Sequence, residues 1–364
     1  MAGIVEADRE AVLSKPHFAV GIAQLALYPD RIDVRSPSEF ADDHIPGAAS
    51  HPVLDDEERA RVGTLHAQES AFVAKQHGAA LVARNIAAML ESSFAGKPRD
   101  WRPLVYCWRG GKRSGSLTHV LNEIGWKAAQ LDGGYKAYRR SVIEALARLP
   151  QTLSYRVICG VTGSGKSRLL RALAGAGAQV LDLEDLARHR GSLLGDLPGA
   201  PQPSQKRFES LLWDALRNLD PARPVFVEAE SKKVGEIRVP QNLIDAMWAS
   251  PCLRLETALP CRVALLRDEY AHFIADPAEL GHKLSHLTAL RGADTTARWR
   301  EQAAAGDWDA LVEDLLVTHY DPVYLRSMRR NYPQYDSAEV VEVSDFGHAA
   351  WAEAADRIVA GHAR

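Results

Sequence analysis

The segment VYCWRGGKRSGS, residues 105 to 116, places one cysteine among several cations. Cys107 ends a short apolar run, and Arg109, Lys112 and Arg113 follow within six residues. Nearby positive charge and the N-terminus of a following helix both stabilise a thiolate, so this pattern predicts a lowered thiol pKa and a nucleophilic role. The loop would also stabilise an anion attached to the sulfur or approaching it. The predicted anion-binding loop consists of Trp108, Arg109, Gly110, Gly111, Lys112, Arg113 and Ser114.

A second candidate site is the segment GVTGSGKS, residues 160 to 167, which fits the phosphate-loop pattern G-x-x-x-x-G-K-[ST]. Its glycines let backbone N–H groups turn toward a phosphate, Lys166 adds a point charge, and Ser167 is placed to hold a magnesium ion. Glu228 and Glu230 stand where a nucleotide hydrolase usually presents an aspartate, so the pattern favours phosphate binding over ATP hydrolysis. The predicted phosphate-binding residues are Gly160, Thr162, Gly163, Ser164, Gly165, Lys166 and Ser167.

Short apolar strands precede both sites, and helical patterns follow them. Residues 31–36, 103–108 and 155–159 are typical of strands. Residues 114–124 carry apolar side chains at the spacing of one helix face, with Gly125 placed to end the helix. Strands that alternate with helices predict parallel sheets covered on both faces, which is an α/β fold.

The length of the chain allows two or three domains. It has 364 residues, of which 46% are apolar and 25% charged. A proline and a new strand near residue 150 indicate a boundary. We expect an α/β domain over residues 1–148 with the Cys107 loop, a P-loop α/β domain over 149–277, and a mostly helical extension over 278–364 that completes the P-loop domain.

Cysteine usage and hydropathy indicate a cytoplasmic protein. The four cysteines form no C-x-x-C pair, which argues against disulfides and a zinc site in a reducing compartment. His282 and His286 have no third ligand near them in the sequence, so we expect no metal site there. No segment resembles a signal peptide, and no apolar run is long enough to span a bilayer.

The charge distribution points to a polyanionic partner. The net charge of the chain is −3, yet the stretch from Arg99 to Arg171 contains fourteen Lys and Arg and four acidic residues, a net charge of +10. A basic middle region that surrounds two candidate anion sites favours a polyanionic partner over an ordinary solvated surface.

The region around Cys107 resembles the rhodanese domain. DVRSPSEF with Asp33 and Arg35, HIPGA at 44–48 and LDGGYKAY at 131–138 match that family's pattern. The resemblance implies that Asp33 and Arg35 are structural and that the loop cysteine carries a transferable chalcogen.

The spacing of the Cys107 loop also fits a different chemistry. Cys107 and Arg113 are separated as in cysteine phosphatases, Cys-x5-Arg, although Tyr106 stands where a phosphatase usually has histidine. The loop is one residue longer than the usual ring of rhodanese sulfurtransferases, which leaves room for a tetrahedral, phosphate-like group. A chalcogen donor that bears a phosphate would satisfy both patterns.

Over nearly its full length, the chain resembles the tRNA 2-selenouridine synthase family. The combination of YCWRGGKRS, CGVTGSGKS, HRGSLLGDLP, VEAESKKVG and HYDPVY carries this resemblance. It implies an enzyme that acts on 2-thiouridine at the wobble position, 34, of tRNA. The family replaces that sulfur with selenium from selenophosphate, and it also transfers a geranyl group from geranyl diphosphate to the sulfur. The resemblance therefore implies that the S-geranyl product is the intermediate.

The resemblance assigns roles to both loops. The P-loop would hold the departing diphosphate, with magnesium as an optional ion and no tightly bound cofactor. The Cys107 loop would handle selenophosphate, with Cys107 either taking selenium as a selenyl-sulfide or guiding its attack. Arg139 and Arg140 are candidate contacts for the anticodon arm, and a selenophosphate-synthesising enzyme is a candidate partner.

Two other interpretations remain open on the residues alone. One is a rhodanese-type sulfurtransferase or Cys-x5-Arg phosphatase fused to a P-loop small-molecule kinase. The other is a P-loop switch joined to a catalytically silent rhodanese module that binds partners.

Overall fold

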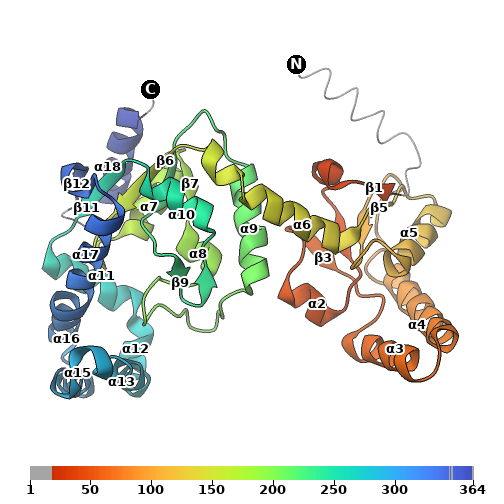
Figure 1. Cartoon of the computed structure of the whole chain (residues 1–364), viewed down its shortest axis with the longest axis horizontal. Coiled ribbons are helices and arrows are strands. Elements are labelled where there is room, and N and C mark those ends of the chain that lie inside the picture. Colours follow the sequence, from red (N-terminus) through yellow and green to blue (C-terminus); the bar gives the residue numbers. More distant parts are fainter. Residues whose placement is uncertain (1–18, 344, 346, 363–364) are drawn as a thin grey trace. The chain divides into compact units, whose positions relative to one another are not determined.

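The computed structural model describes residues 19–343, 345 and 347–362. The chain divides into two compact units (Figure 1), one of Met1–Ala145 with Ser204–Asp214 and the other of Leu146–Pro203 with Ala215–Arg364. This division falls three residues before the boundary that we expected after residue 148. The transfer of residues 204–214 to the first unit was not predicted, and the first 18 residues of the expected first domain lie outside the described residues.

The first unit is built on a five-stranded parallel sheet with the order β1-β5-β4-β2-β3. Its strands are β1 (Ala19–Val20), β2 (Arg31–Asp33), β3 (Ala48–Ser50), β4 (Leu104–Tyr106) and β5 (Ala129–Leu131). Its helices are the 3-10 helix η1 (Ile22–Leu27), α2 (Pro37–Asp42), α3 (Asp56–Gln68), α4 (Ala71–Glu91), α5 (Lys112–Ile124) and α6 (Gly134–Leu146).

Central strand β4 and helix α5 form the core of this unit. All three residues of β4 are buried, as a continuous apolar run in a parallel sheet requires. Leu117 and Leu121 lie on one face of α5 and pack in the same apolar cluster as Val105. Gly125 ends α5 with φ of 105°, a left-handed conformation in which glycine has no steric penalty. The strand and helix therefore fix both ends of the Cys107 loop.

The beginning of helix α9 (Gln205–Arg217) belongs to the first unit. The Ser210 hydroxyl donates to a carboxylate oxygen of Asp43 at 2.9 Å, and Arg207 donates to the carbonyl of His44 at 2.8 Å. Lys206 and Asp42 form an ion pair at 2.7 Å. These contacts explain why residues 204–214 separate from the P-loop unit, with which they are contiguous in sequence.

The second unit contains another five-stranded parallel sheet, with the order β12-β11-β6-β8-β7. Its strands are β6 (Tyr155–Cys159), β7 (Gln179–Leu181), β8 (Val225–Glu228), β11 (Cys252–Glu256) and β12 (Glu339–Glu342), with an antiparallel pair of β9 (Lys233–Val234) and β10 (Ile237–Arg238). Its α-helices before residue 270 are α7 (Lys166–Gly175), α8 (Leu183–Ala187), the end of α9, α10 (Gln241–Trp248) and α11 (Leu259–Glu269), with the 3-10 helix η2 (Leu149–Thr152).

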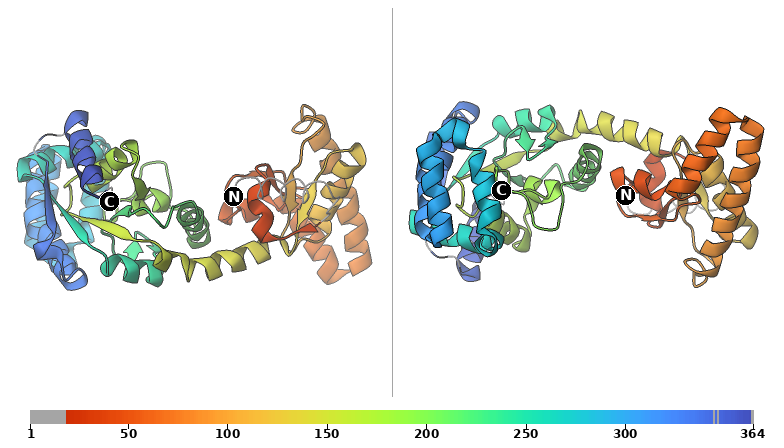
Figure 2. Two further views of the ribbon diagram at one scale, coloured as in Figure 1. Left: turned by 90° about the horizontal axis from the view of Figure 1, so that it is seen from above. Right: turned by 90° about the horizontal axis from the view of Figure 1, so that it is seen from below.

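The C-terminal part is helical and completes this sheet. It contains α12 (Ala271–Ala275), α13 (Pro277–Ser285), α14 (Thr288–Arg291), α15 (Ala293–Ala305), α16 (Trp308–Leu315), the π-helix η3 (Leu316–Tyr320), α17 (Asp321–Asn331), the 3-10 helix η4 (Tyr335–Ser337) and α18 (His348–His362). Strand β12 returns to the sheet as an edge strand beside β11, and α18 packs against α7 (Figure 2).

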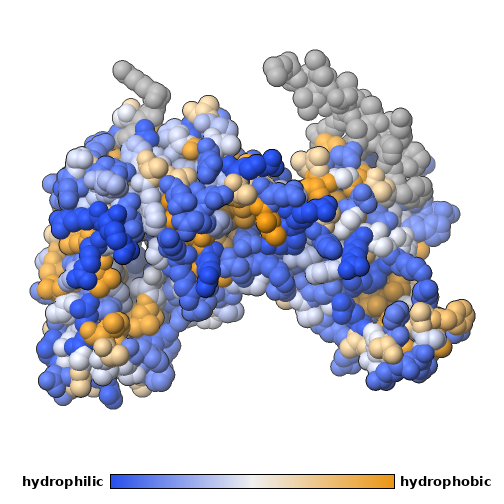
Figure 3. Space-filling view, in the orientation of Figure 1, coloured by the Kyte–Doolittle hydropathy of each residue, from blue (hydrophilic) through white to orange (hydrophobic). Residues whose placement is uncertain are grey.

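The face of the molecule drawn in Figure 3 is mostly hydrophilic. Figure 3 shows small apolar patches separated by hydrophilic residues on the face that it draws. None of the described helices combines the length and apolar character needed to cross a bilayer.

Candidate active sites

The Cys107 loop connects the end of β4 to the start of α5, so its thiol faces the N-terminus of a helix. The side chain of Cys107 is buried, with 4% of its surface exposed. Its sulfur accepts a hydrogen bond from the Ser114 hydroxyl, with 3.1 Å between Oγ and Sγ. The Gln130 amide donates to Ser114 Oγ at 2.9 Å and to the carbonyl of Gly111 at 3.0 Å, which orients the serine.

The LDGGYKAY segment holds the loop by close backbone contacts. Backbone N–H groups of Tyr135 and Lys136 donate to the carbonyls of Cys107 and Trp108, both at 2.9 Å. Gly134 has a φ of +55°, and a Cβ there would collide with the Cys107 carbonyl oxygen. Gly110 has a φ of +65°, and a Cβ there would lie 2.5 Å from the Leu131 carbonyl oxygen. Both positions therefore require glycine.

The pKa of the Cys107 thiol lies below its ordinary value. Burial of the thiol raises the pKa, but hydrogen bonds from the Ser114 hydroxyl and from the backbone N–H groups of Ser114, Gly111 and Arg109 lower it by more. The predicted direction is therefore found. Of the two predicted causes, donation at the helix N-terminus is among the largest influences, whereas the charges of the three cations are not. Hydrogen bonds to the charged form stabilise a thiolate directly, whereas exposed cations are screened by water.

The three cations of the loop have different surroundings. The Arg113 guanidinium donates to the Glu39 carboxylate at 2.9 Å. Burial raises the pKa of Glu39, but its contact with Arg113 outweighs burial and holds the pKa below the ordinary value. Arg109 and Lys112 are exposed, and neither pairs with an acidic side chain within the described part of the chain. These two cations are therefore available to an anion at the thiol.

Asp33 and Arg35 form a buried ion pair next to this loop. The Arg35 guanidinium donates to Asp33 at 2.6 Å and lies 3.9 Å from the centre of the Tyr135 ring. The Tyr135 hydroxyl in turn donates to Asp43 at 2.8 Å. This network joins β2, α2 and α6, and supports the structural role that the rhodanese resemblance implied for Asp33 and Arg35.

The two candidate tRNA contacts on α6 differ in exposure. Arg139 is largely buried and forms ion pairs with Glu209 and with Asp43, the latter at 3.8 Å. The charge of Arg139 is thus paired inside the first unit, which makes it a weaker candidate for the anticodon arm than we expected. Arg140 is exposed and remains a candidate contact.

The P-loop lies between β6 and α7, as its motif predicts. Lys166 begins α7, and its ammonium donates to the Gly160 carbonyl at 2.8 Å. The Gly160 N–H donates to the Tyr324 hydroxyl oxygen at 3.0 Å.

Arg262 supports the loop from another helix. It donates to the Thr162 carbonyl at 2.7 Å and pairs with Asp321 at 2.6 Å. The side-chain hydroxyl of Ser164 is buried and has no hydrogen-bond partner among the described residues. Gly163 and Gly165 have positive φ values.

Three glutamates lie beside the P-loop. The Ser167 hydroxyl donates to Glu184 at 2.9 Å, and the Glu184 N–H donates to Glu228 at 2.9 Å. Burial and the neighbouring acids raise the pKa of Glu228 well above its ordinary value. Burial and the charge of Glu184, opposed by Lys166, raise the pKa of Glu230 to about 8. Glu228 and Glu230 are therefore largely neutral at pH 7.

A cavity of about 390 Å³ opens over this loop. Its polar lining includes Lys166, Ser167, Glu184, Glu230 and Arg190. Nη1 of Arg190 is buried without a hydrogen-bond partner among the described residues, and its guanidinium lies 4.8 Å from the Tyr270 ring centre. An arginine in this position has the charge and the donors that recognise a phosphate group.

Sequence reasoning did not select Glu184, Arg190 or Tyr324 as site residues. Arg190 and Tyr324 lie in HRGSLLGDLP and HYDPVY, which carried the family resemblance, but no spacing rule connects them to the P-loop. The described residues contain no group of three or more His, Cys, Asp and Glu side chains arranged to hold a metal. The oxygens of Ser167 and Glu184 are nevertheless hard ligands of the kind that Mg²⁺ prefers, together with phosphate oxygens.

The fold and the two sites define a class of protein in which a rhodanese-like domain is joined to a P-loop domain. Residues 24–141 match the model of the rhodanese-like domain, and residues 153–282 match that of the tRNA 2-selenouridine synthase AAA domain.

Three relatives, each called tRNA 2-selenouridine synthase, extend these matches over most of the chain. The Cupriavidus necator protein is 35% identical over 84% of this chain and 88% of its own length. The Marinobacter nauticus protein is 32% identical over 80% and 86%. The Nitrosomonas europaea protein is 36% identical over 66% of this chain and 63% of its own length. The chain belongs to the tRNA 2-selenouridine synthase family.

Proposed function

We propose that this chain is a tRNA-modifying enzyme of the cytoplasm that converts 2-thiouridine at wobble position 34 to 2-selenouridine. Geranyl diphosphate is the proposed alkyl donor and selenophosphate the proposed selenium donor. Family membership supports the formation of selenouridine in tRNA, because the relatives carry that name. The observation that carries the finer proposal is the presence of two different anion sites, a thiol loop and a P-loop with an adjoining cavity.

The first proposed step takes place at the P-loop. The thiocarbonyl sulfur attacks C1 of geranyl diphosphate, a C–S bond forms, and the C–O bond breaks with its electron pair going to diphosphate. The N3 proton of the base is released to solvent. Lys166 and Arg190 stabilise the charge that develops on this leaving group. Ser167 and Glu184 would hold Mg²⁺, which supplies further charge neutralisation when it is bound. S-alkylation makes the sulfur a better leaving group from C2.

The second proposed step takes place at the Cys107 loop. A selenyl-sulfide on Cys107 needs an oxidant to form from selenophosphate, whereas attack of the thiolate on phosphorus is redox-neutral. In that attack an S–P bond forms and the P–Se bond breaks, so that selenium leaves with the electron pair. The selenide then attacks C2 and displaces geranylthiolate, while water hydrolyses the phosphocysteine to phosphate. Arg109, Lys112 and the loop N–H groups stabilise the phosphoryl oxygens.

The experiment that tests this function is mass spectrometry of the nucleosides from a 2-thiouridine tRNA incubated with the enzyme. With geranyl diphosphate alone we expect S-geranyl-2-thiouridine, and with both donors we expect 2-selenouridine. Selenophosphate alone should leave 2-thiouridine unchanged. Selenouridine formed without geranyl diphosphate would contradict the S-geranyl route. A selenophosphate-synthesising enzyme added to the assay should replace the added selenophosphate.

A further inference from the structure

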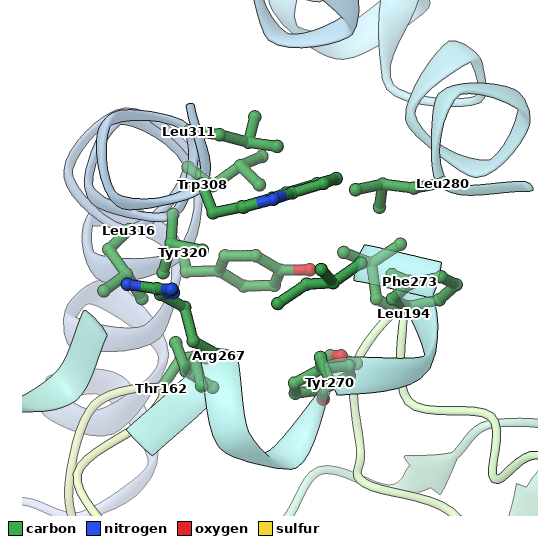
Figure 4. Close-up of a pocket in the computed structure, with 15 residues that line it drawn as sticks. Thr162, Leu194, Arg267, Tyr270, Phe273, Leu280, Trp308, Leu311, Leu316 and Tyr320 are labelled. Atoms are coloured by element: carbon green, nitrogen blue, oxygen red, sulfur yellow. The ribbon is translucent and has the colours of Figure 1, made fainter. Parts of the chain in front are cut away.

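A second cavity, which is apolar, adjoins the P-loop cavity. Its volume is about 70 Å³, room for about five water molecules. Leucines and aromatic side chains from α11, α12, α13, α16 and η3 line it. In Figure 4 the rings of Trp308 and Tyr320, which line the cavity, lie in the middle of the view. Leu280, Phe273 and Leu194 lie on one side of them, and Leu316, Arg267 and Thr162 on the other.

The two cavities share five lining residues. These are Thr162, Ser192, Leu266, Tyr270 and Tyr320. Burial raises the pKa of both tyrosines, and the neighbouring Ser192 side chain opposes that rise. Leu266 packs directly against the phosphate loop, since a Cβ at Gly163 would lie 2.8 Å from its side chain. An apolar cavity thus begins where the phosphate-binding residues end.

This juxtaposition suits a ligand with a diphosphate at one end and a short hydrocarbon chain at the other. A nucleotide base has several donors and acceptors that need partners when buried, and the apolar cavity offers few. A branched hydrocarbon needs none, and each buried CH₂ contributes about 0.8 kcal/mol, roughly fourfold in affinity.

We infer that the apolar cavity binds the hydrocarbon chain of the allylic diphosphate donor while the P-loop holds the diphosphate. This inference rests on the proposed function, because it gives the alkyl donor its binding site. Leu280, Leu311 and Trp308 line the cavity without lining the P-loop cavity, and are the residues that determine which chain fits.

The test is calorimetric binding of geranyl, dimethylallyl and inorganic diphosphate to the full-length protein. We expect wild-type protein to bind geranyl diphosphate at least tenfold more tightly than dimethylallyl diphosphate. Leu280→Phe fills the cavity and should remove most of this preference while the affinity for inorganic diphosphate stays unchanged. Leu284→Phe is the matched control, because Leu284 lies in the same helix and apolar cluster but does not line the cavity.

The outcomes separate this inference from the proposed function. If Leu280→Phe keeps the full preference for geranyl diphosphate, the chain binds elsewhere and the inference is wrong while the function stands. If wild-type protein binds geranyl and inorganic diphosphate equally, the proposed donor itself is wrong.

Tryptophan fluorescence gives a second test that needs no large substitution. Geranyl diphosphate, but not inorganic diphosphate, should change the emission, and Trp308→Phe should abolish that change; an unaltered change in the variant would overturn the inference.

Discussion

Replacing Ser114 by alanine should make the Cys107 thiol a weaker acid. The Ser114 hydroxyl donates to Sγ at 3.1 Å and is the largest influence that lowers the pKa of this thiol. A hydrogen bond to a charged group contributes about 1.5–3 kcal/mol, and about 1.4 kcal/mol corresponds to a factor of ten. We therefore expect the ratio of thiolate to thiol at Cys107, compared at one fixed pH, to fall by roughly tenfold or more in Ser114→Ala.

The assay is the pH dependence of iodoacetamide alkylation, with the Cys107 peptide quantified by mass spectrometry. Peptide resolution matters because the chain has three other cysteines. Ser116→Ala is the matched control, since Ser116 lies in the same helix but donates to the Lys112 carbonyl at 2.9 Å. Lys112→Ala should change the profile less than Ser114→Ala does. If Ser114→Ala left the profile unchanged while Lys112→Ala shifted it, the cations would control the thiolate and our explanation would fail.

Three further predictions concern the tRNA surface, the P-loop acids and the buried ion pair. Arg140→Glu should weaken tRNA binding. In a salt series, it should lower the slope of log affinity against log salt by about one or less per lost phosphate contact. Arg84→Glu changes an exposed residue outside the basic stretch and should leave both the affinity and the slope unchanged. Geranyl diphosphate should bind more weakly as the pH rises above about 8, because ionised Glu230 repels the diphosphate. Calorimetry with EDTA present should show a loss of affinity of up to tenfold per pH unit. Glu230→Gln should remove this pH dependence, and a pH dependence that persists in the variant would implicate another group. Asp33→Ala should lower the free energy of unfolding by about 3–5 kcal/mol in urea titrations, because it leaves the buried Arg35 charge unpaired. Asp42→Ala removes an exposed ion pair and should lower it by under about 1 kcal/mol. Similar losses in the two variants would argue against the role of burial.

The parts of the fold that depend on local patterns were predictable from the sequence. Strand β6 covers the predicted residues 155–159, and Gly125 ends α5 as expected, because buried apolar runs and left-handed glycines are determined by near neighbours. The fold class, two parallel α/β sheets with a helical C-terminal part, is confirmed. The association of residues 204–214 with the first unit was not predicted, because it depends on a buried carboxylate, Asp43, more than 160 residues earlier in the chain.

The candidate sites were predicted in their loops but not in their surroundings. The sequence indicated a thiolate at Cys107, yet the donors that lower its pKa include Ser114, whose orientation depends on Gln130 from a neighbouring strand. Glu184 meets Ser167 because β7 and β6 lie in one sheet on either side of β8, an order that no motif encodes. The roles of the individual residues in the reaction stay predictions.

The most direct test of the two-site mechanism compares Cys107→Ser and Lys166→Ala in one nucleoside assay with tRNA, geranyl diphosphate and selenophosphate. We expect Cys107→Ser to accumulate S-geranyl-2-thiouridine without selenouridine, because a serine hydroxyl is far less acidic than the thiol and attacks phosphorus poorly. Lys166→Ala should lose about a hundredfold or more in the rate of geranylation while it still binds tRNA. Normal selenouridine formation by Cys107→Ser, or undiminished geranylation by Lys166→Ala, would contradict the assignment of the two steps to these two loops.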